Sequence, residues 1–484
     1  MKTRLNDFSF DQIHTSTIQM LCLLLVGLLE VLAMCLGNFV YPEFRHTAAE
    51  YINLIGIFYF AVTIRKPLSH TARNLLLLGL AFCLWPLAMQ LRDFIFVLNP
   101  EHPDIRFPQN TYFCEYLMML SFGAAAQKDG QIRGFRLFGW FYIASSALLT
   151  LWAMPIGWGL IPEAIRKPGI WHILRLKLVW NELVLALIYM LGISMCLVYA
   201  CMYRNLYLRI GLAVLACLEF IPLVLTDSRS VVMMTCCIFG GAAFVCIYRG
   251  NGKSAAAGLL AGLVITGACF AFSGEIYSRH VQNFMDASLE QQSETAAAAP
   301  EGEETEQIGS AGDLQQYLTP EEYEREREYR TSNKHLVEFG GRVSIWKGAL
   351  RVLAENPRFL LFGVRDHQRC IPFRKDFAYH AHNSWLETLM QLGIIGLAFA
   401  CWLTYLAVRH AFSLVFLKKC PRYQKLVCVC MIGLMVSQLV EVYLFIGSYP
   451  SNFANMLFLF CLGYLICWDQ AAPPIREQQK KLRK

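Results

Sequence analysis

Long apolar runs recur along the whole chain and constrain its fold more than any other feature. A helix needs about 20 apolar residues to cross the ~30 Å hydrocarbon layer of a membrane. Charged residues make up 16% of the 484 positions, well below the roughly one quarter that is usual in soluble domains. The sequence therefore predicts an all-α polytopic membrane protein with about twelve transmembrane helices, near residues 18–40, 48–64, 74–90, 111–127, 137–157, 178–200, 206–226, 230–248, 255–273, 384–408, 426–446 and 452–469.

Lys and Arg are distributed unevenly among the segments that connect these runs. With the N-terminus placed in the cytoplasm, the cytoplasmic segments carry 22 of them and the short outer connections carry eight. Cytoplasmic connections of membrane proteins are enriched in Lys and Arg, so we expect both termini in the cytoplasm. The net charge of +7 is explained by this orientation signal and gives no reason to expect nucleic-acid binding.

The predicted spans divide the chain into four parts. Residues 1–273 hold transmembrane helices 1–9, residues 274–383 form a large extracytoplasmic loop, residues 384–469 hold helices 10–12, and residues 470–484 form a basic cytoplasmic tail. Within the loop, residues 286–316 are rich in Ala, Glu, Gln, Ser and Gly and are predicted to be disordered, because they cannot bury enough apolar surface to fold. Residues 319–356 are predicted to be helical, and their apolar positions from Val343 to Leu353 indicate an amphipathic helix along the membrane surface.

Two histidines and an asparagine stand at the end of the large loop, at the last polar point before the tenth apolar run. Histidine is the side chain whose ordinary pKa suits proton transfer near neutral pH. We expect His382 to be the working residue, with His380 as the alternative, because in a helix the two would point to different sides. Asn383 is expected to cap the next helix or to orient His382. A hydrogen-bonded interfacial histidine without a catalytic role is the simpler alternative.

Arginines stand at two predicted helix starts. Arg229 follows Asp227 and Ser228 at the start of the eighth span, and Arg342 follows two glycines at the start of the amphipathic helix. A cation there opposes the helix dipole, whereas phosphates bind at helix N-termini, so both arginines are predicted to bind phosphate. For Arg229 an ion pair with Asp227 is the alternative. Further candidates for phosphate or sugar contacts, which attraction to anionic headgroups would equally explain, are Arg365, Arg369 and Arg374.

Three stretches of this region carry a resemblance to a known family. They read G-G-R-V-S-I-W-K-G-A-L, then P-R-F-L-L-F-G-V, then H-A-H-N-S-W-L-E-T-L-M-Q-L-G-I-I-G-L, with nine residues between His382-Asn383 and Gly393, and Gly396 three further on. This pattern resembles the signature region of the O-antigen ligase and O-antigen polymerase family. Ser228-Arg229 is similar to the outer-face arginine of that family. The resemblance covers about residues 340–400 in detail, whereas the first 200 residues match in hydropathy alone.

The resemblance implies a metal-independent, cofactor-free glycosyltransferase of the membrane-embedded GT-C-like type. Its donor would be a glycan on undecaprenyl diphosphate at the outer face of the bacterial cytoplasmic (inner) membrane, among membrane lipids. Its acceptor would be a lipid A-core or another glycan. The catalytic histidine of the family corresponds to His382, and its essential arginines to Arg229 and Arg342.

The chemistry of these residue types agrees with that expectation. Glycosyl transfer from a diphosphate needs a base for the acceptor hydroxyl and cations for the leaving group, and no Asp-x-Asp metal motif stands out in the outer loop. Ligase and polymerase share the pattern, so both remain open. A polysaccharide transporter or flippase is less favoured, because such proteins are built from internal repeats with charges near the midplane, and here the polar residues cluster at one face.

Overall fold

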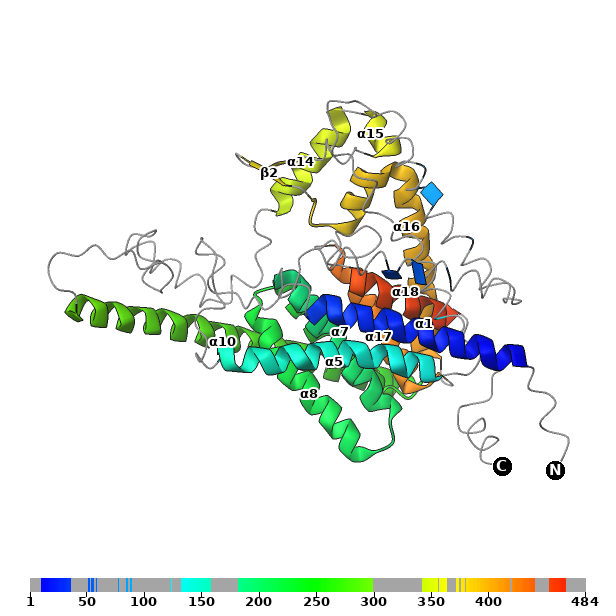
Figure 1. Cartoon of the computed structure of the whole chain (residues 1–484), viewed down its shortest axis with the longest axis horizontal. Coiled ribbons are helices and arrows are strands. Elements are labelled where there is room, and N and C mark those ends of the chain that lie inside the picture. Colours follow the sequence, from blue (N-terminus) through cyan, green and yellow to red (C-terminus); the bar gives the residue numbers. More distant parts are fainter. Residues whose placement is uncertain are drawn as a thin grey trace. The chain divides into compact units, whose positions relative to one another are not determined.

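The computed structural model of the chain describes residues 10–35, 51–52, 54–55, 58, 77, 84–85, 88, 123, 132–157, 182–298, 342–355, 357–363, 371–373, 376–378, 380–417, 420–439 and 452–466. Its regular elements are almost entirely α-helices (Figure 1). They are α1 (Phe10–Cys35), α5 (Ile132–Gly157), α7 (Glu182–Met202), α8 (Leu206–Leu225), α9 (Arg229–Ile247), α10 (Gly252–Ala298), α14 (Arg342–Glu355), α15 (Pro357–Phe362), β1 (Ile371–Phe373), β2 (Asp376–Ala378), α16 (Ser384–Phe416), α17 (Arg422–Ser437) and α18 (Asn452–Ile466).

Five of the described helices are long and apolar enough to cross a membrane. They are Leu183–Met202 in α7, Leu206–Leu225 in α8, Arg229–Ile247 in α9, Gly252–Arg279 in α10 and Ser384–Phe416 in α16. Each coincides with a predicted span, which agrees with an integral membrane protein. Shorter apolar stretches lie in α1, α5 and α18. The other predicted spans fall on these stretches, on α17 or largely on residues outside the described part, and they stay predictions.

Within the residues predicted to form the large loop, two features differ from the prediction. α10 continues beyond residue 273, where the ninth span was expected to end, as far as Ala298. For residues 286–298 the structure therefore replaces predicted disorder with helix, because Ala, Glu and Gln are strong helix formers that extend a helix already nucleated. The second difference is a hairpin: β1 and β2 pair antiparallel, with Pro372 opposite Phe377. An all-α prediction missed these two short strands.

The chain divides into two compact units. Unit 1 comprises residues 1–145, 248–254 and 341–484, and unit 2 comprises residues 146–247 and 255–340. Unit 1 contains the loop around His382, and unit 2 contains Arg229.

Unit 2 is centred on α7, the most buried of the candidate spans, which packs against α8 and α9. Ser146 donates a hydrogen bond of 2.7 Å to the fully buried carboxyl group of Glu219 on α8. A methyl group at Gly192 on α7 would meet the Ser146 hydroxyl at 2.0 Å, so only glycine leaves room for this polar contact. Close approach of helices at small residues is typical of membrane bundles.

Within unit 1, α16 is kinked at Gly393. Gly393 has φ +67° and ψ −170°, a conformation that is essentially restricted to glycine. The kink frees the carbonyl of Leu392, which accepts a hydrogen bond of 2.8 Å from the indole of Trp85. Beyond the kink, residues 394–416 are roughly 35 Å long at 1.5 Å per residue, which is enough to cross the membrane.

A second glycine, Gly363, lies close to the kink at Gly393. Gly363 follows α15 with φ +78°, and a methyl group there would meet the carbonyl oxygen of Gln391 at 2.1 Å. A methyl group at Gly393 would in turn meet the carbonyl oxygen of Leu361 at 2.1 Å. α15 and the kink of α16 are thus in backbone contact, which fixes the segment of α16 before Gly393 against α15.

The kink generates the first prediction. Gly393→Ala should lower the free energy of unfolding by more than about 2 kcal/mol, because the new methyl group meets backbone and this backbone conformation alone costs about 1–3 kcal/mol for other residues. Thermal unfolding of the purified protein measures the effect. Gly211→Ala on α8 is the control, since a methyl group there meets nothing within 4 Å. Equal stability of the two variants would contradict the described kink.

Candidate active site

Residues His380, Ala381, His382 and Asn383 connect β2 to α16, and we call them the histidine loop. His382 has φ +49°, in the left-handed region that residues other than glycine rarely occupy. Backbone strain of this kind persists where the surrounding structure fixes it, and it is concentrated at functional sites. In the histidine loop, hydrogen bonds on both sides of His382 provide this fixation.

Ala381, the residue before His382, makes hydrogen bonds through both its backbone C=O and its backbone N–H group. The carbonyl oxygen of Ala381 accepts a hydrogen bond of 2.9 Å from the indole N–H of Trp346 on α14. Its N–H donates a hydrogen bond of 2.7 Å to Oε2 of Glu387 on α16. The other oxygen of Glu387 accepts from the side chain of Gln391 at 2.6 Å. Ala381 and Glu387 are fully buried, so these bonds are protected from competition by water.

The residues after His382 are held by the end of α17. The side-chain amide of Asn383 donates to the carbonyl oxygen of Leu439 at 2.8 Å, and the N–H of Ser384 donates to the carbonyl oxygen of Gln438 at 2.9 Å. Asn383 also accepts a hydrogen bond from the N–H of Leu386, so its predicted capping of the next helix is confirmed. The histidine loop thus joins α14, α16 and α17.

The two histidines lie together rather than on opposite sides. Their ring centroids are 4.0 Å apart, and the rings meet edge to face at 62°. The expectation that they point to different sides assumed a helix, and it is wrong because residues 380–382 form a loop. His380 is exposed, whereas His382 is partly buried. Only the second is held in the left-handed conformation.

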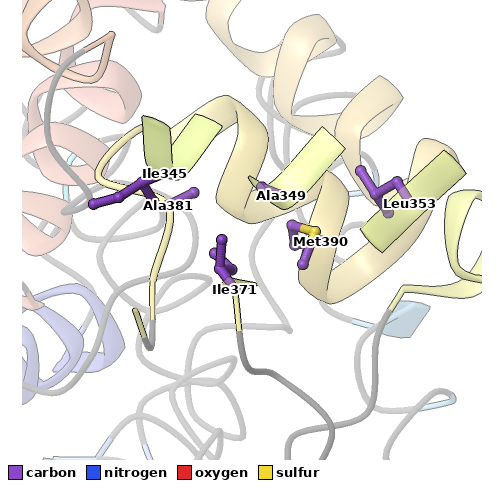
Figure 2. Close-up of a cluster of buried hydrophobic side chains, with 6 residues drawn as sticks. All are labelled: Ile345, Ala349, Leu353, Ile371, Ala381 and Met390. Atoms are coloured by element: carbon purple, nitrogen blue, oxygen red, sulfur yellow. The ribbon is translucent and has the colours of Figure 1, made fainter. Parts of the chain in front are cut away.

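A small apolar core packs against the histidine loop and includes Ala381 of that loop (Figure 2). It consists of Ile345, Ala349 and Leu353 on α14, Ile371 on β1, Ala381, and Met390 on α16. The three α14 residues are four positions apart and therefore line one face of the helix. The predicted helix is confirmed for residues 342–355, and its apolar face packs on the histidine loop and on the part of α16 before Gly393. Its place along the membrane surface stays a prediction.

Arg342 is the first residue of α14 and is half-buried. It precedes Trp346 by four residues, so the two side chains lie on the same side of the helix. Because Trp346 bonds to Ala381, this side of α14 is the one that contacts the histidine loop. The structure therefore brings Arg342 and His382 to one part of unit 1, although they are 40 positions apart in the sequence.

Arg229 begins α9 in unit 2, after a tight turn. Asp227 has φ +53°, and its carboxyl group lies 3.6 Å from Nε of Arg229. The ion pair with Asp227 that was the alternative to phosphate binding is thus present. One quarter of the Arg229 side chain is exposed, whereas that of Asp227 is buried. The acid therefore holds the guanidinium group at the helix start while leaving part of it accessible.

Three further predicted residues cannot be placed. Arg365, Arg369 and Arg374 lie outside the described residues. Within the described part of the chain, no group of three or more His, Cys, Asp or Glu side chains is arranged to hold a metal ion.

Sequence reasoning missed the groups that support the histidine loop. Glu387 could have been noticed as an acid in the first turn of a predicted helix, where its charge interacts favourably with the helix dipole. Trp346 gives no signal beyond its place on an amphipathic helix. Gln438 and Leu439 act through backbone carbonyls that no pattern reveals. The side-chain amide of Gln438 is fully buried, and none of the described residues hydrogen-bonds to it.

The apolar helices define an integral membrane protein, and the polar loop at the start of α16 gives it a candidate active site. Residues 212–401, from α8 into α16, match the family model described as O-antigen ligase, so this segment is similar to the O-antigen ligase and polymerase family. Among curated proteins no match to the chain is found. The family implies ligase or polymerase activity of the glycosyltransferase type in polysaccharide biosynthesis, on lipid-linked glycan and acceptor substrates.

The support of the histidine loop generates the second prediction. Trp346→Phe keeps the aromatic packing and removes one hydrogen bond to Ala381, worth about 1 kcal/mol. Hydrogen–deuterium exchange of peptides covering residues 380–386 should then be faster by about fivefold. Trp402→Phe is the matched control, because Trp402 lies on the exposed side of α16. Unchanged exchange in Trp346→Phe would show that this bond does not hold the loop.

Proposed function

We propose that this protein is a glycosyltransferase that moves a glycan from undecaprenyl diphosphate to an acceptor hydroxyl at the outer face of the bacterial inner membrane. The observation that supports this most is the histidine loop. It presents His382 in a strained conformation at the start of a candidate span, fixed by bonds to three helices. An imidazole held in this way loses little freedom when a substrate binds, which favours proton transfer in a fixed geometry.

The proposed membrane arrangement has twelve spans, with residues 274–383 as the large outer loop and both termini in the cytoplasm. The charge bias of the connections supports it, and so does α17. The histidine loop contacts the C-terminal end of α17, whereas Arg422 and Lys425 lie in its first turn. The two ends of this 16-residue helix are roughly 24 Å apart at 1.5 Å per residue. Cation-rich ends of membrane helices lie in the cytoplasm. With the cations of α17 on the cytoplasmic side, the histidine loop at its other end lies at the outer face.

In the proposed reaction, His382 accepts the proton of the acceptor hydroxyl group. The hydroxyl oxygen forms a bond to the anomeric carbon of the donor sugar, and the bond from that carbon to the diphosphate oxygen breaks. Undecaprenyl diphosphate leaves with the bonding electrons, and the imidazolium later releases its proton to water. General base catalysis of this kind contributes about 10²–10⁴-fold to a rate.

The leaving diphosphate gains negative charge, which needs donors placed in advance. Arg342 is the proposed donor in unit 1, on the side of α14 that contacts the histidine loop. Arg229 is the proposed second donor, because its guanidinium group is oriented by Asp227 at a helix start. Arginine stabilises phosphate oxygens without supplying a proton, and we propose that these cations make a metal ion unnecessary. His380, Asn383, Arg365, Arg369 and Arg374 have supporting roles in this proposal.

Ligase activity is the first choice and polymerase activity the second. The ligase would transfer the glycan to a lipid A-core, and the polymerase would extend another lipid-linked chain. The two differ in product, because a ligase gives a single transfer and a polymerase gives a ladder of lengths. Incubation of the purified protein with the donor and each acceptor, followed by gel separation, distinguishes them.

The third prediction concerns the base. His382→Ala should reduce the rate of glycan transfer by at least about 10²-fold, in assays with purified protein, undecaprenyl diphosphate glycan and acceptor, without divalent metal. His380→Ala removes the supporting histidine beside it and should cost much less of the rate than His382→Ala. Unaltered turnover in His382→Ala would point to His380 or to no catalysis by the loop. A requirement for added divalent metal in the wild type would contradict the proposed role of the arginines.

The fourth prediction concerns the guanidinium group of Arg342. Arg342→Lys keeps the charge but loses bidentate hydrogen bonding, so transfer should fall by about ten- to a hundredfold. Arg351→Lys, on an exposed position of the same helix, should retain the wild-type rate. Equal rates for Arg342→Lys and the wild type would remove Arg342 from the proposed diphosphate site.

A further inference from the structure

Two glutamines lie buried at the two ends of α17, although glutamine is mostly exposed in folded proteins. Gln424 in the first turn of the helix is 2% exposed, and Gln438, which directly follows the helix, is 0% exposed. Burying a side-chain amide is costly unless hydrogen bonds within the protein replace those made to water. The partners of the two amides therefore indicate what each one is buried for.

Gln424 has partners at both ends of its amide. Its side-chain N–H donates to the hydroxyl oxygen of Tyr464 on α18 at 3.4 Å. Its carbonyl oxygen accepts from the thiol of Cys420 at 3.6 Å. Both partners are themselves buried. The burial of Gln424 is thus explained by the packing of α17 against α18, and this amide has a structural role.

Gln438 differs from Gln424 in this respect. Both Nε2 and Oε1 of its amide are buried, and none of the described residues hydrogen-bonds to either atom. Its backbone carbonyl is paired, because it accepts from the N–H of Ser384 at 2.9 Å. Native proteins pair the large majority of their buried polar side-chain atoms, and an unpaired amide lowers stability. A glutamine kept where an apolar side chain would be more stable indicates a functional role.

The position of Gln438 connects this amide with the candidate active site. Ser384, which bonds to its carbonyl, is two positions after His382. The next residue, Leu439, is 52% exposed, and its carbonyl accepts from the side chain of Asn383 in the histidine loop. The protein surface therefore begins one residue away from the buried amide, beside the histidine loop. Rotation about the side-chain bonds of Gln438 can present the amide at this surface.

The chemistry of an amide selects among the groups of a lipid-linked glycan. The side chain of glutamine offers two N–H donors and one carbonyl acceptor. Diphosphate oxygens only accept hydrogen bonds, so a diphosphate would leave the carbonyl oxygen unpaired. A hydroxyl group both donates and accepts, and two neighbouring hydroxyl groups of a sugar ring pair with both ends of the amide. The unpaired amide of Gln438 therefore matches a sugar better than it matches the diphosphate.

We propose that the side-chain amide of Gln438 binds two neighbouring hydroxyl groups on a sugar of the glycan substrate, next to the histidine loop. The sugar belongs either to the donor glycan or to the acceptor, which offer the same chemistry. A site that hydrogen-bonds a substrate hydroxyl group discriminates against sugars that lack it, so Gln438 contributes to sugar selectivity. The inference rests on the proposed function. Gln438 itself lies outside residues 212–401 of the family match.

The test measures binding without turnover, by native mass spectrometry of the purified full-length protein. The separate probes are undecaprenyl diphosphate glycan, a lipid A-core, and undecaprenyl diphosphate without sugar. Gln438→Met keeps the length of the side chain and removes both hydrogen-bonding groups. It should weaken binding of one glycan probe by about tenfold, the loss expected for a good hydrogen bond, and leave binding of undecaprenyl diphosphate unchanged. The glycan probe that loses affinity identifies the substrate whose sugar Gln438 binds.

Thermal unfolding of the same variants separates a binding role from a structural one. Gln438→Met should raise the melting temperature by about 1–2 °C, because it removes an unpaired buried amide. Gln424→Met is the matched control, since it changes a buried glutamine that has partners. It should lower the melting temperature by a similar amount and bind all three probes as the wild type does. A lower melting temperature in Gln438→Met would show that its amide has a structural role, and would overturn the proposal.

The binding results separate a failure of this inference from a failure of the proposed function. Equal binding of both glycan probes by Gln438→Met and the wild type would overturn the inference and leave the proposed transferase in place. An equal loss for undecaprenyl diphosphate without sugar would overturn it as well, because that probe has no sugar hydroxyl groups. A wild-type protein that bound neither glycan probe would contradict the proposed function and this inference with it.

Discussion

The hydrogen bonds that flank His382 are the interaction on which the rest of the site depends. A left-handed backbone at a histidine costs free energy, and it persists here because Ala381 is held by Trp346 and Glu387 while Asn383 and Ser384 are held by the end of α17. Each partner comes from a different part of the sequence. The apolar core between α14, β1 and α16 keeps these partners in place, so packing energy maintains the strained conformation of His382.

Gly363 and Gly393 add a second contact that holds the first part of α16 in place. Gly393 and Gly363 allow α15 and α16 to meet backbone to backbone, and the indole of Trp85 satisfies the carbonyl group that the kink frees. The segment of α16 before Gly393 can therefore pack against α14 and α15 while the rest of the helix remains long enough to cross a membrane. α17 begins with Arg422 and Lys425 in its first turn, at the end opposite to the one that contacts the histidine loop.

The sequence predicted the elements whose physical signal is local. Apolar length predicted the spans of α7 to α10 and α16, the spacing of Val343 to Leu353 predicted α14, and the Asn383 cap predicted the start of α16. The hairpin of β1 and β2 was missed because two strands of three residues carry almost no pattern. Trp346, Gln438 and Leu439 could not be predicted, because their role is a contact between distant segments. The helical assumption for His380 and His382 failed because residues 380–382 form a loop, in which the two rings meet edge to face.

The central claim is that the imidazole of His382 meets the substrate during transfer. Its most direct test is chemical modification of the purified protein with diethyl pyrocarbonate, in which mass spectrometry measures the modified fraction of each histidine beside the remaining activity. The account predicts that activity falls in proportion to modification of His382, and that undecaprenyl diphosphate glycan slows modification of His382 more than that of the exposed His380. Full modification of His382 with undiminished transfer would contradict it.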